Sequence, residues 1–198
     1  MKIVLASSNK GKITEFKRIF SGLEIEVIPQ SELHIKDVPE TGLTFIENAL
    51  IKARHASLQS GLPAISDDSG ILVEALQNRP GIYSARFAGS HATGDENIQK
   101  LLNELKNISL EKRNAFFYCV LVFLSHPEDP TPIIAEGIWQ GKILHETRGM
   151  KGFGYDPIFY DENEKCSAAE LDLNKKNQIS HRGKALAALL KKMKEKRG

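Results

Sequence analysis

The sequence has little cysteine and no long apolar run, and each shortage excludes a class of protein. Its two cysteines, Cys119 and Cys166, are too few for a disulfide framework and lack the spacing of a metal site. No segment approaches the ~18 to 20 continuous apolar residues of a transmembrane helix, and the N-terminus lacks a signal-peptide layout. We therefore expect a soluble cytoplasmic protein with no membrane partner.

An excess of charge of one sign is also missing. The 198 residues contain 27 Lys+Arg and 25 Asp+Glu, which gives a formal net charge of +2. A dedicated nucleic-acid binder has a strong basic excess, so we expect no nucleic-acid partner. Any phosphate chemistry must then come from local clusters. The basic residues near the C-terminus are interpreted as a solvated helix end: Lys191, Lys192, Lys194, Lys196 and Arg197.

Apolar periodicity predicts a mixture of strands and helices in a single domain, 1–198. Thr44 with Glu47, and Thr93 with Glu96, have the spacing of capping boxes that start helices. This mixture favours an α/β fold with long strands in the middle. The predicted strands cover 3–6, 115–124 and 133–139, and the predicted helices cover 13–20, 44–61, 95–106 and a C-terminal segment around 186–193.

A polar loop that joins the first predicted strand to the first predicted helix suits an anion. Backbone N–H groups at a helix start attract anions, and two lysines add positive charge. The loop is not a Walker A motif, because Ala6 and Ile13 replace the required Gly and Ser/Thr. A solvated turn is the alternative. The loop residues are Ser7, Ser8, Asn9, Lys10, Gly11 and Lys12.

Two adjacent carboxylates, Asp67 and Asp68, follow the short apolar piece 64–65 and are predicted to lie at a strand end or turn. Mg²⁺ prefers oxygen ligands and usually needs one or two carboxylates plus substrate phosphates. An Asx turn is the commoner fate of such a string. Glu40 is a candidate for a further carboxylate ligand, although a loop glutamate is usually solvated.

The segment Phe153-Gly154-Tyr155-Asp156 has glycine for close backbone approach and an aromatic face for a nucleobase. A β-turn with core aromatics is the alternative. His181 and Arg182, at the predicted start of the last helix, are a source of donors for a polar ring or a phosphate. Residues of these types at a helix start are ordinarily on the surface.

Six blocks taken together closely resemble the inosine/xanthosine triphosphate pyrophosphatase family. Each block is weak alone, but all six occur in the family's order and span nearly the whole chain. They are 7–12, Glu40-Thr41-Gly42 through Ala49, Asp67-Asp68-Ser69-Gly70, Gly81 through Arg86, Phe153 through Pro157, and Ser180-His181-Arg182-Gly183.

The resemblance implies an elongated mixed sheet with flanking helices, two lobes around a nucleotide-binding cleft, and a homodimer. It also implies Mg²⁺-dependent hydrolysis of inosine, deoxyinosine and xanthosine triphosphates to monophosphate and pyrophosphate. By the same resemblance, residues 7–12 and Lys52 bind phosphates, Glu40 and Asp68 bind the metal, and Asp68 is the proton acceptor. Ser69 touches the substrate, and the nucleoside is held by Phe153, Gly154, Tyr155, Asp156, Lys176, His181 and Arg182.

Deaminated purines present an O6 acceptor and an N1–H donor where adenine presents an amino group and a bare N1. We expect His181 or Arg182 to donate to O6 and Asp156 to accept from N1–H, because unpaired buried donors discriminate strongly. Two alternatives stay open. One is a related pyrophosphatase for other modified nucleotides, and the other is a non-catalytic nucleotide-binding or RNA-binding protein.

Overall fold

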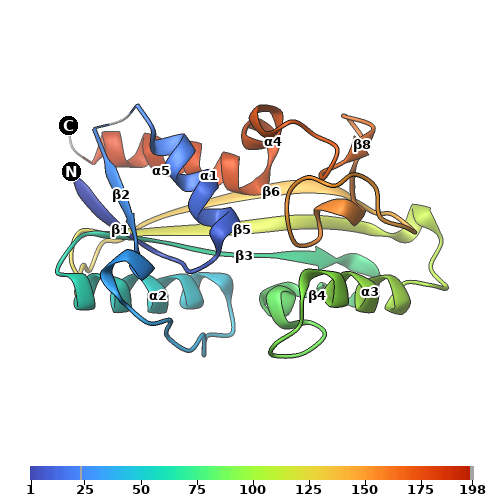
Figure 1. Cartoon of the computed structure of the whole chain (residues 1–198), viewed down its shortest axis with the longest axis horizontal. Coiled ribbons are helices and arrows are strands. Elements are labelled where there is room, and N and C mark those ends of the chain that lie inside the picture. The colour runs from blue at the N-terminus through green and yellow to red at the C-terminus, as the bar shows by residue number, and fades with distance from the viewer. Residues whose placement is uncertain (23, 197–198) are drawn as a thin grey trace. The chain divides into compact units, whose positions relative to one another are not determined.

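The computed structural model describes residues 1–22 and 24–196 (Figure 1). Arg197, the last residue of the predicted basic run, lies outside them. An eight-stranded sheet has the order β2-β1-β3-β5-β6-β7-β8, with β4 paired to β3. The strands are β1 (Lys2–Ala6), β2 (Glu26–Pro29), β3 (Ala64–Val73), β4 (Arg79–Pro80), β5 (Asn114–Leu124), β6 (Ile133–Ile143), β7 (Phe159–Asp161) and β8 (Cys166–Ser167).

Helices follow or precede most of these strands. The α-helices are α1 (Lys10–Phe20), α2 (Phe45–Ser60), α3 (Gly94–Glu104), α4 (Leu173–Ile179) and α5 (His181–Glu195). The 3₁₀ helices are η1 (Gln30–Leu33), η2 (Glu74–Leu76), η3 (Gly81–Arg86), η4 (Leu110–Lys112) and η5 (Asp156–Ile158). Within the described residues, no helix combines the length and apolar character needed to cross a membrane.

The sheet is mixed. Strand β1 pairs in parallel with both β2 and β3, with Val4 opposite Ala64 and Ala6 opposite Ser66. Strand β7 pairs antiparallel with both β6 and β8. The α/β class with a mixed sheet and flanking helices is therefore confirmed.

The chain divides into two compact units, and each is described by itself. Unit 1 comprises Met1–Asp68, Cys119–Gly137 and the segment from Lys184 onward, whereas unit 2 comprises Ser69–Tyr118 and Ile138–Gly183. The elements β3, β5, β6 and α5 each contribute residues to both units. Asp68 is thus the last residue of β3 in unit 1, and Ser69 is the first in unit 2.

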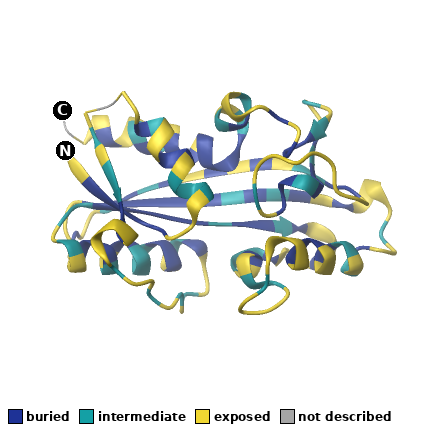
Figure 2. Ribbon diagram, viewed as in Figure 1, coloured by how far each residue is buried: buried dark blue, intermediate teal, exposed yellow. Residues whose placement is uncertain are grey.

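Unit 1 has its own apolar core. Ile3, Ile65 and Leu121 from the strands pack with Phe16 of α1 and Leu189 of α5. Helix α2 lies on the other side of these strands (Figure 1). Its strand-facing positions are small and fully buried, which permits close helix–sheet contact: they are Ala49, Ala53 and Ala56. Figure 2 shows the buried strands between partly exposed helices.

The ends of the two capping-box helices match their predictions. In α2, Thr44 accepts from the Glu47 N–H, the Glu47 side chain accepts from the Thr44 N–H, and Gly61 ends the helix at φ 68°. In α3, Thr93 and Glu96 form the same reciprocal pair. Both boxes are local, since all their partners lie within three residues of each other.

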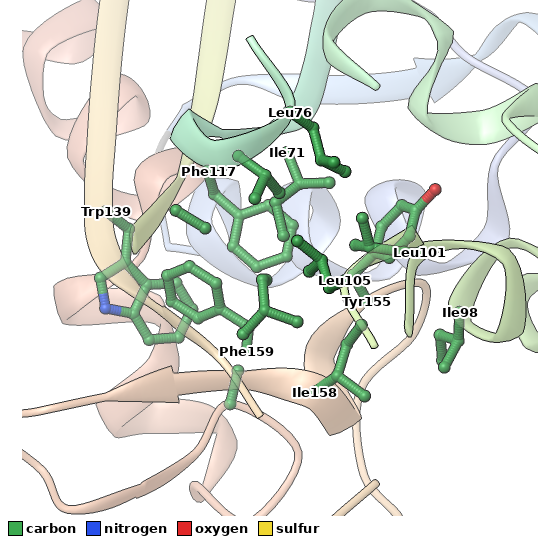
Figure 3. Close-up of a cluster of buried hydrophobic side chains, with 14 of the residues drawn as sticks. Ile71, Leu76, Ile98, Leu101, Leu105, Phe117, Trp139, Tyr155, Ile158 and Phe159 are labelled. Atoms are coloured by element: carbon green, nitrogen blue, oxygen red, sulfur yellow. The ribbon is translucent and has the colours of Figure 1, made fainter. Parts of the chain in front are cut away.

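Unit 2 has a second core, shown in Figure 3. Ile98 and Leu101 of α3, with Leu105 at its C-cap, pack against a group of aromatic side chains that includes Phe117 and Phe159. The ring centroids of Phe117 and Phe159 lie 4.5 Å apart. The helix that apolar periodicity predicts over 95–106 is therefore confirmed as Gly94–Glu104.

One local prediction was wrong. Asp67 and Asp68 do not lie at a strand end or turn, because β3 continues without a break from Ala64 to Val73. The turn that this sequence favours does not form, because each carboxylate pairs with a lysine on its own side of the strand, Asp67 with Lys12 and Asp68 with Lys52. The short elements β2, β4, β7, β8 and α4 were not predicted, since two to seven residues carry too little periodicity to detect.

Candidate active site

The predicted anion loop is shorter than expected, because α1 begins at Lys10. The Asn9 side chain caps the helix by accepting from the Lys12 N–H at 3.1 Å. Ser7 Oγ accepts from the Asn9 N–H at 3.2 Å, and Ser8 Oγ donates to Asp37 at 2.8 Å. The loop is thus a capped start of an eleven-residue helix, which suits an anion.

Lys12 is held by Asp67. Its Nζ lies 2.5 Å from Asp67 Oδ1, and it donates to the Asp67 main-chain carbonyl at 3.3 Å. The Asp67 side chain is fully buried, and the Cys119 thiol donates to its Oδ2 at 3.4 Å. A buried carboxylate needs such partners, so Asp67 acts first as the anchor of Lys12. Cys119 is buried in the core.

Asp68 has a separate partner from the opposite side of the strand, because successive strand residues point to opposite faces. Lys52 of α2 donates to Asp68 Oδ1 at 2.7 Å and to Glu40 Oε1 at 2.8 Å. It also donates to the Asp67 carbonyl at 3.0 Å. The three side chains are mostly buried, with exposed fractions of 15% for Lys52, 26% for Glu40 and 9% for Asp68.

Burial and charge act against each other in this cluster. Burial raises the pKa of Asp68 above its usual value, although the Lys52 ammonium offsets part of this effect. Burial by itself would lower the pKa of Lys52, but the attraction of Asp68 and Glu40 outweighs it and raises that pKa. Lys52 therefore stays charged, while Asp68 becomes a better proton acceptor than an ordinary aspartate.

The cluster also fits a divalent cation. Asp68 Oδ2 is buried and has no hydrogen-bond partner within residues 1–22 and 24–196. An unpartnered buried carboxylate oxygen is costly unless a cation or a donor reaches it. No group of three or more His, Cys, Asp or Glu side chains arranged for a metal occurs in the described part of the chain. Two carboxylates, Glu40 and Asp68, are the kind of oxygen donors that Mg²⁺ takes together with phosphate oxygens.

The segment that carries Glu40 is fixed by the first turn of α2. Asn48 Oδ1 accepts from the Gly42 N–H at 2.8 Å, and Glu47 Oε2 accepts from the Leu43 N–H at 2.8 Å. A Cβ at Gly42 would lie 2.5 Å from Glu47 Cβ, so only glycine fits. Asn48 is fully buried and was missed, since a polar residue within a helix has no sequence signal of its own.

In unit 2, two cations lie over the ring of Phe153. Lys176 Nζ is 5.1 Å and Arg182 Cζ is 5.6 Å from the ring centroid. Arg182 also donates to Ser69 Oγ at 3.0 Å. Lys176 rather than Lys175 belongs to this cluster, because Lys175 pairs with Glu164 at 2.8 Å.

Asp156 holds this part of the chain together. Its Oδ2 lies 2.5 Å from Lys176 Nζ and accepts from the Phe153 N–H at 2.7 Å. Gly152 has φ 78°, and a Cβ there would collide with the Asp156 carboxylate. Tyr155 belongs to the unit 2 core, where its hydroxyl donates to the Ser84 carbonyl at 2.8 Å. Burial raises the pKa of Tyr155. Because its side chain belongs to the core, only the Tyr155 backbone is left to contact a ligand.

His181 and Arg182 start α5, as predicted, but they are not surface residues. They are 6% and 3% exposed. The His181 ring stacks on Phe117 with centroids 4.7 Å apart and planes 12° apart. Next to them, Gly183 permits close approach to α4, because a Cβ there would collide with the Asn177 carbonyl. The burial of the His181 ring follows from its contact with Phe117, which is distant in sequence.

The lysines and carboxylates of unit 1 suit a phosphorylated ligand, and the cations on an aromatic ring in unit 2 suit a flat base, so the α/β fold and these groups together define a protein that acts on nucleotides. Comparison with known proteins narrows this class. The chain matches the Ham1 family model over residues 3–192, and it belongs to this family. The predicted resemblance is thus confirmed.

The similarity extends over the whole length of several relatives. The chain is 53% identical over 188 residues to the dITP/XTP pyrophosphatase of Vibrio parahaemolyticus, which covers 95% of this chain and 94% of that protein. A HAM1 protein from Coxiella burnetii has a solved structure with 49% identity and a TM-score of 0.91, covering 98% of this chain and 99% of that one. The Staphylococcus aureus Ham1 structure is 42% identical, with a TM-score of 0.86 and full coverage of both chains.

Proposed function

We propose that this protein hydrolyses deaminated purine nucleoside triphosphates, namely those of inosine, deoxyinosine and xanthosine, to monophosphate and pyrophosphate. The observation that carries the proposal is the buried Glu40–Lys52–Asp68 cluster in a chain 53% identical to a dITP/XTP pyrophosphatase. Its biological effect is to remove these nucleotides before they enter DNA or RNA.

The hydrolytic step is assigned to Asp68. Its Oδ2 is the carboxylate oxygen without a described partner, so it is free to accept a proton from water. The water oxygen bonds to the α-phosphorus, its proton passes to Asp68, and the bond from that phosphorus to the bridging oxygen of pyrophosphate breaks. When bound to Glu40 and Asp68, Mg²⁺ neutralises negative charge on the phosphates.

The triphosphate is assigned to the start of α1 and to the lysines. The N–H groups of the first helical turn attract anions, and Lys10 is exposed beside them. Lys12 and Lys52 add two positive charges beside β3, where they pair with Asp67 and Asp68. These groups contact parts of the substrate that every nucleoside triphosphate shares.

Recognition of the base is assigned to unit 2. Phe153 offers a ring to stack on, and Arg182 and His181 offer donors for O6. Asp156 Oδ2 already accepts from Lys176 and Phe153, which fixes the turn. Its use as the acceptor for N1–H stays a hypothesis, as does the nucleotide-binding cleft implied by the resemblance.

We propose further that the enzyme requires Mg²⁺, works as a homodimer and acts in the cytoplasm. The two carboxylates that fit a hard cation support the first point. The resemblance described above supports the dimer. The cytoplasmic location rests on the nature of the substrates, which belong to the cellular nucleotide pool.

A panel of nucleoside triphosphates tests the function. Purified protein with Mg²⁺ is expected to release pyrophosphate from inosine, deoxyinosine and xanthosine triphosphates and to use ATP poorly. Chelation of the metal should abolish release, and added Mg²⁺ should restore it. Stepwise release of orthophosphate, or equal use of ATP, would contradict the proposal.

A further inference from the structure

Lys52 occupies a position that a metal cation would also seek. Its ammonium lies 2.8 Å from Glu40 Oε1 and 2.7 Å from Asp68 Oδ1, the two carboxylates assigned to Mg²⁺. We propose that Lys52 is an internal counter-cation that competes with the metal for these carboxylates and transfers to the substrate phosphates when the metal binds. The proposal rests on the metal site of the proposed function.

The charge balance of the cluster supports competition. One ammonium faces two carboxylates, and all three side chains are mostly buried. Removing the ammonium leaves two buried negative charges close together, which is costly until another cation arrives. Lys12 cannot replace Lys52 without leaving its own partner, because its ammonium lies 2.5 Å from Asp67 Oδ1.

The proposed exchange also leaves the Lys52 ammonium and both carboxylates with a partner of opposite charge. With Glu40 and Asp68 holding a metal, the Lys52 ammonium would lose their attraction and would find a new anionic partner in the phosphates of the substrate. A lysine suits this role, because it is a point charge on a flexible four-carbon stem. Its third contact, the neutral Asp67 carbonyl at 3.0 Å, does not depend on either carboxylate.

The test is Mn²⁺ binding without nucleotide, measured by calorimetry and by electron paramagnetic resonance. We expect Lys52→Met to bind Mn²⁺ at least roughly tenfold more tightly than the wild type, because nearby charges interact strongly in a buried site. Mn²⁺ should also raise the melting temperature of this variant more than that of the wild type. Turnover should nevertheless fall, since the phosphates lose a cation.

Lys17→Met is the matched control. Lys17 also belongs to unit 1 and also pairs with a carboxylate, Glu32, at 2.9 Å. It is half exposed and takes no part in the cluster, so its loss should change Mn²⁺ affinity by less than about twofold. If Lys52→Met does not fold, Lys52→Gln keeps a polar side chain without the charge and has the same expected result.

Two further variants separate this inference from the proposed function. Glu40→Gln and Asp68→Asn should each weaken Mn²⁺ binding. If neither does, or if no form of the protein binds Mn²⁺, the metal assignment fails and the inference fails with it. If both weaken binding while Lys52→Met and Lys52→Gln bind no tighter than the wild type, only the competition by Lys52 is overturned.

Discussion

Unit 1 and unit 2 both bury charged side chains, but they stabilise them in different ways. In unit 1, Lys12 and Lys52 each face a buried carboxylate of β3. In unit 2, Lys176 and Arg182 lie over the ring of Phe153. Carboxylate–lysine pairs favour charge neutralisation and proton transfer, whereas cations on rings favour stacking with a flat base. This difference supports the proposed assignment of the chemical step to unit 1 and of base recognition to unit 2.

The two units also differ in how their parts are held. The unit 1 cluster depends on ion pairs between α1, α2 and one strand. The unit 2 cluster depends on an aromatic core that orients His181 through Phe117, and on Asp156 holding its turn. Substitutions in unit 1 should therefore affect all nucleotides alike, and those in unit 2 should change the preference among them.

The largest effect is expected in unit 1, at Asp68. Asp68→Asn keeps the shape of the side chain but loses the proton acceptor and an anionic ligand, so kcat for inosine triphosphate should fall by at least about a hundredfold. Asp129→Asn is the control, because Asp129 is another buried aspartate of unit 1 and takes no part in the cluster. It should retain turnover. Near-normal kcat for Asp68→Asn at saturating Mg²⁺ would make Asp67 the better candidate.

A smaller effect is expected for base preference. Arg182→Ala or His181→Ala should narrow the preference for inosine triphosphate over ATP by about 1 to 3 kcal/mol, the value of a buried hydrogen bond to O6. Lys10→Ala and Lys12→Ala should lower kcat/KM for both substrates by similar factors. The measurement is kcat/KM for both nucleotides in all four variants.

The ratio of the two kcat/KM values cancels general damage, such as the unpaired Asp67 carboxylate that Lys12→Ala leaves behind. An unchanged ratio in both helix variants would move base recognition elsewhere, most plausibly to the backbone of 153–156. A changed ratio in Lys10→Ala or Lys12→Ala would contradict the assignment of base recognition to unit 2 alone.

A third prediction separates backbone strain from a clash in unit 2. Gly152 and Gly81 both have positive φ, at 78° and 56°, but only a Cβ at Gly152 would collide, with Asp156. Alanine at either position should cost about 1 kcal/mol of unfolding free energy for its backbone. Gly152→Ala should cost roughly 1 to 3 kcal/mol more and raise KM for inosine triphosphate. If urea unfolding gave the same loss of unfolding free energy for Gly152→Ala and Gly81→Ala, the turn at Asp156 would tolerate displacement by the added Cβ.

The smallest effect concerns acid stability in unit 1. Asp129 accepts from the Ser125 and Thr131 N–H groups, and its pKa is lowered from 3.8 to about 2, mainly by the Ser125 bond. A lowered folded-state pKa stabilises the protein above the unfolded pKa, and this stability is lost as pH falls from about 4 to about 2.

Melting temperature measured against pH tests this assignment. At neutral pH, Asp129→Asn should have a lower melting temperature than the wild type. As the pH falls from about 4 to about 2, the melting temperature of the variant should decrease by less than that of the wild type. Parallel curves for the two proteins would assign the acid sensitivity to other carboxylates.

Local patterns determined much of the fold. The capping boxes at Thr44 and Thr93 need partners only three residues away, so sequence spacing predicted both helix starts. The helix over 95–106 was predicted for a similar reason, because its isoleucine and leucines recur at helical spacing. The short pieces of sheet had no such signal and depend on pairing with strands that are distant in sequence.

The amino-acid sequence by itself determined the elements with strong local signals, the residues that carry charge and, through six blocks in order, the family. Only the tertiary structure decided how those residues are used. It made Asp67 and Asp68 part of a strand, because lysines from two helices compensate their charges. It buried His181 against Phe117, which lies 64 residues earlier in the chain. Pairing and burial depend on neighbours distant in sequence, and residue spacing does not encode them.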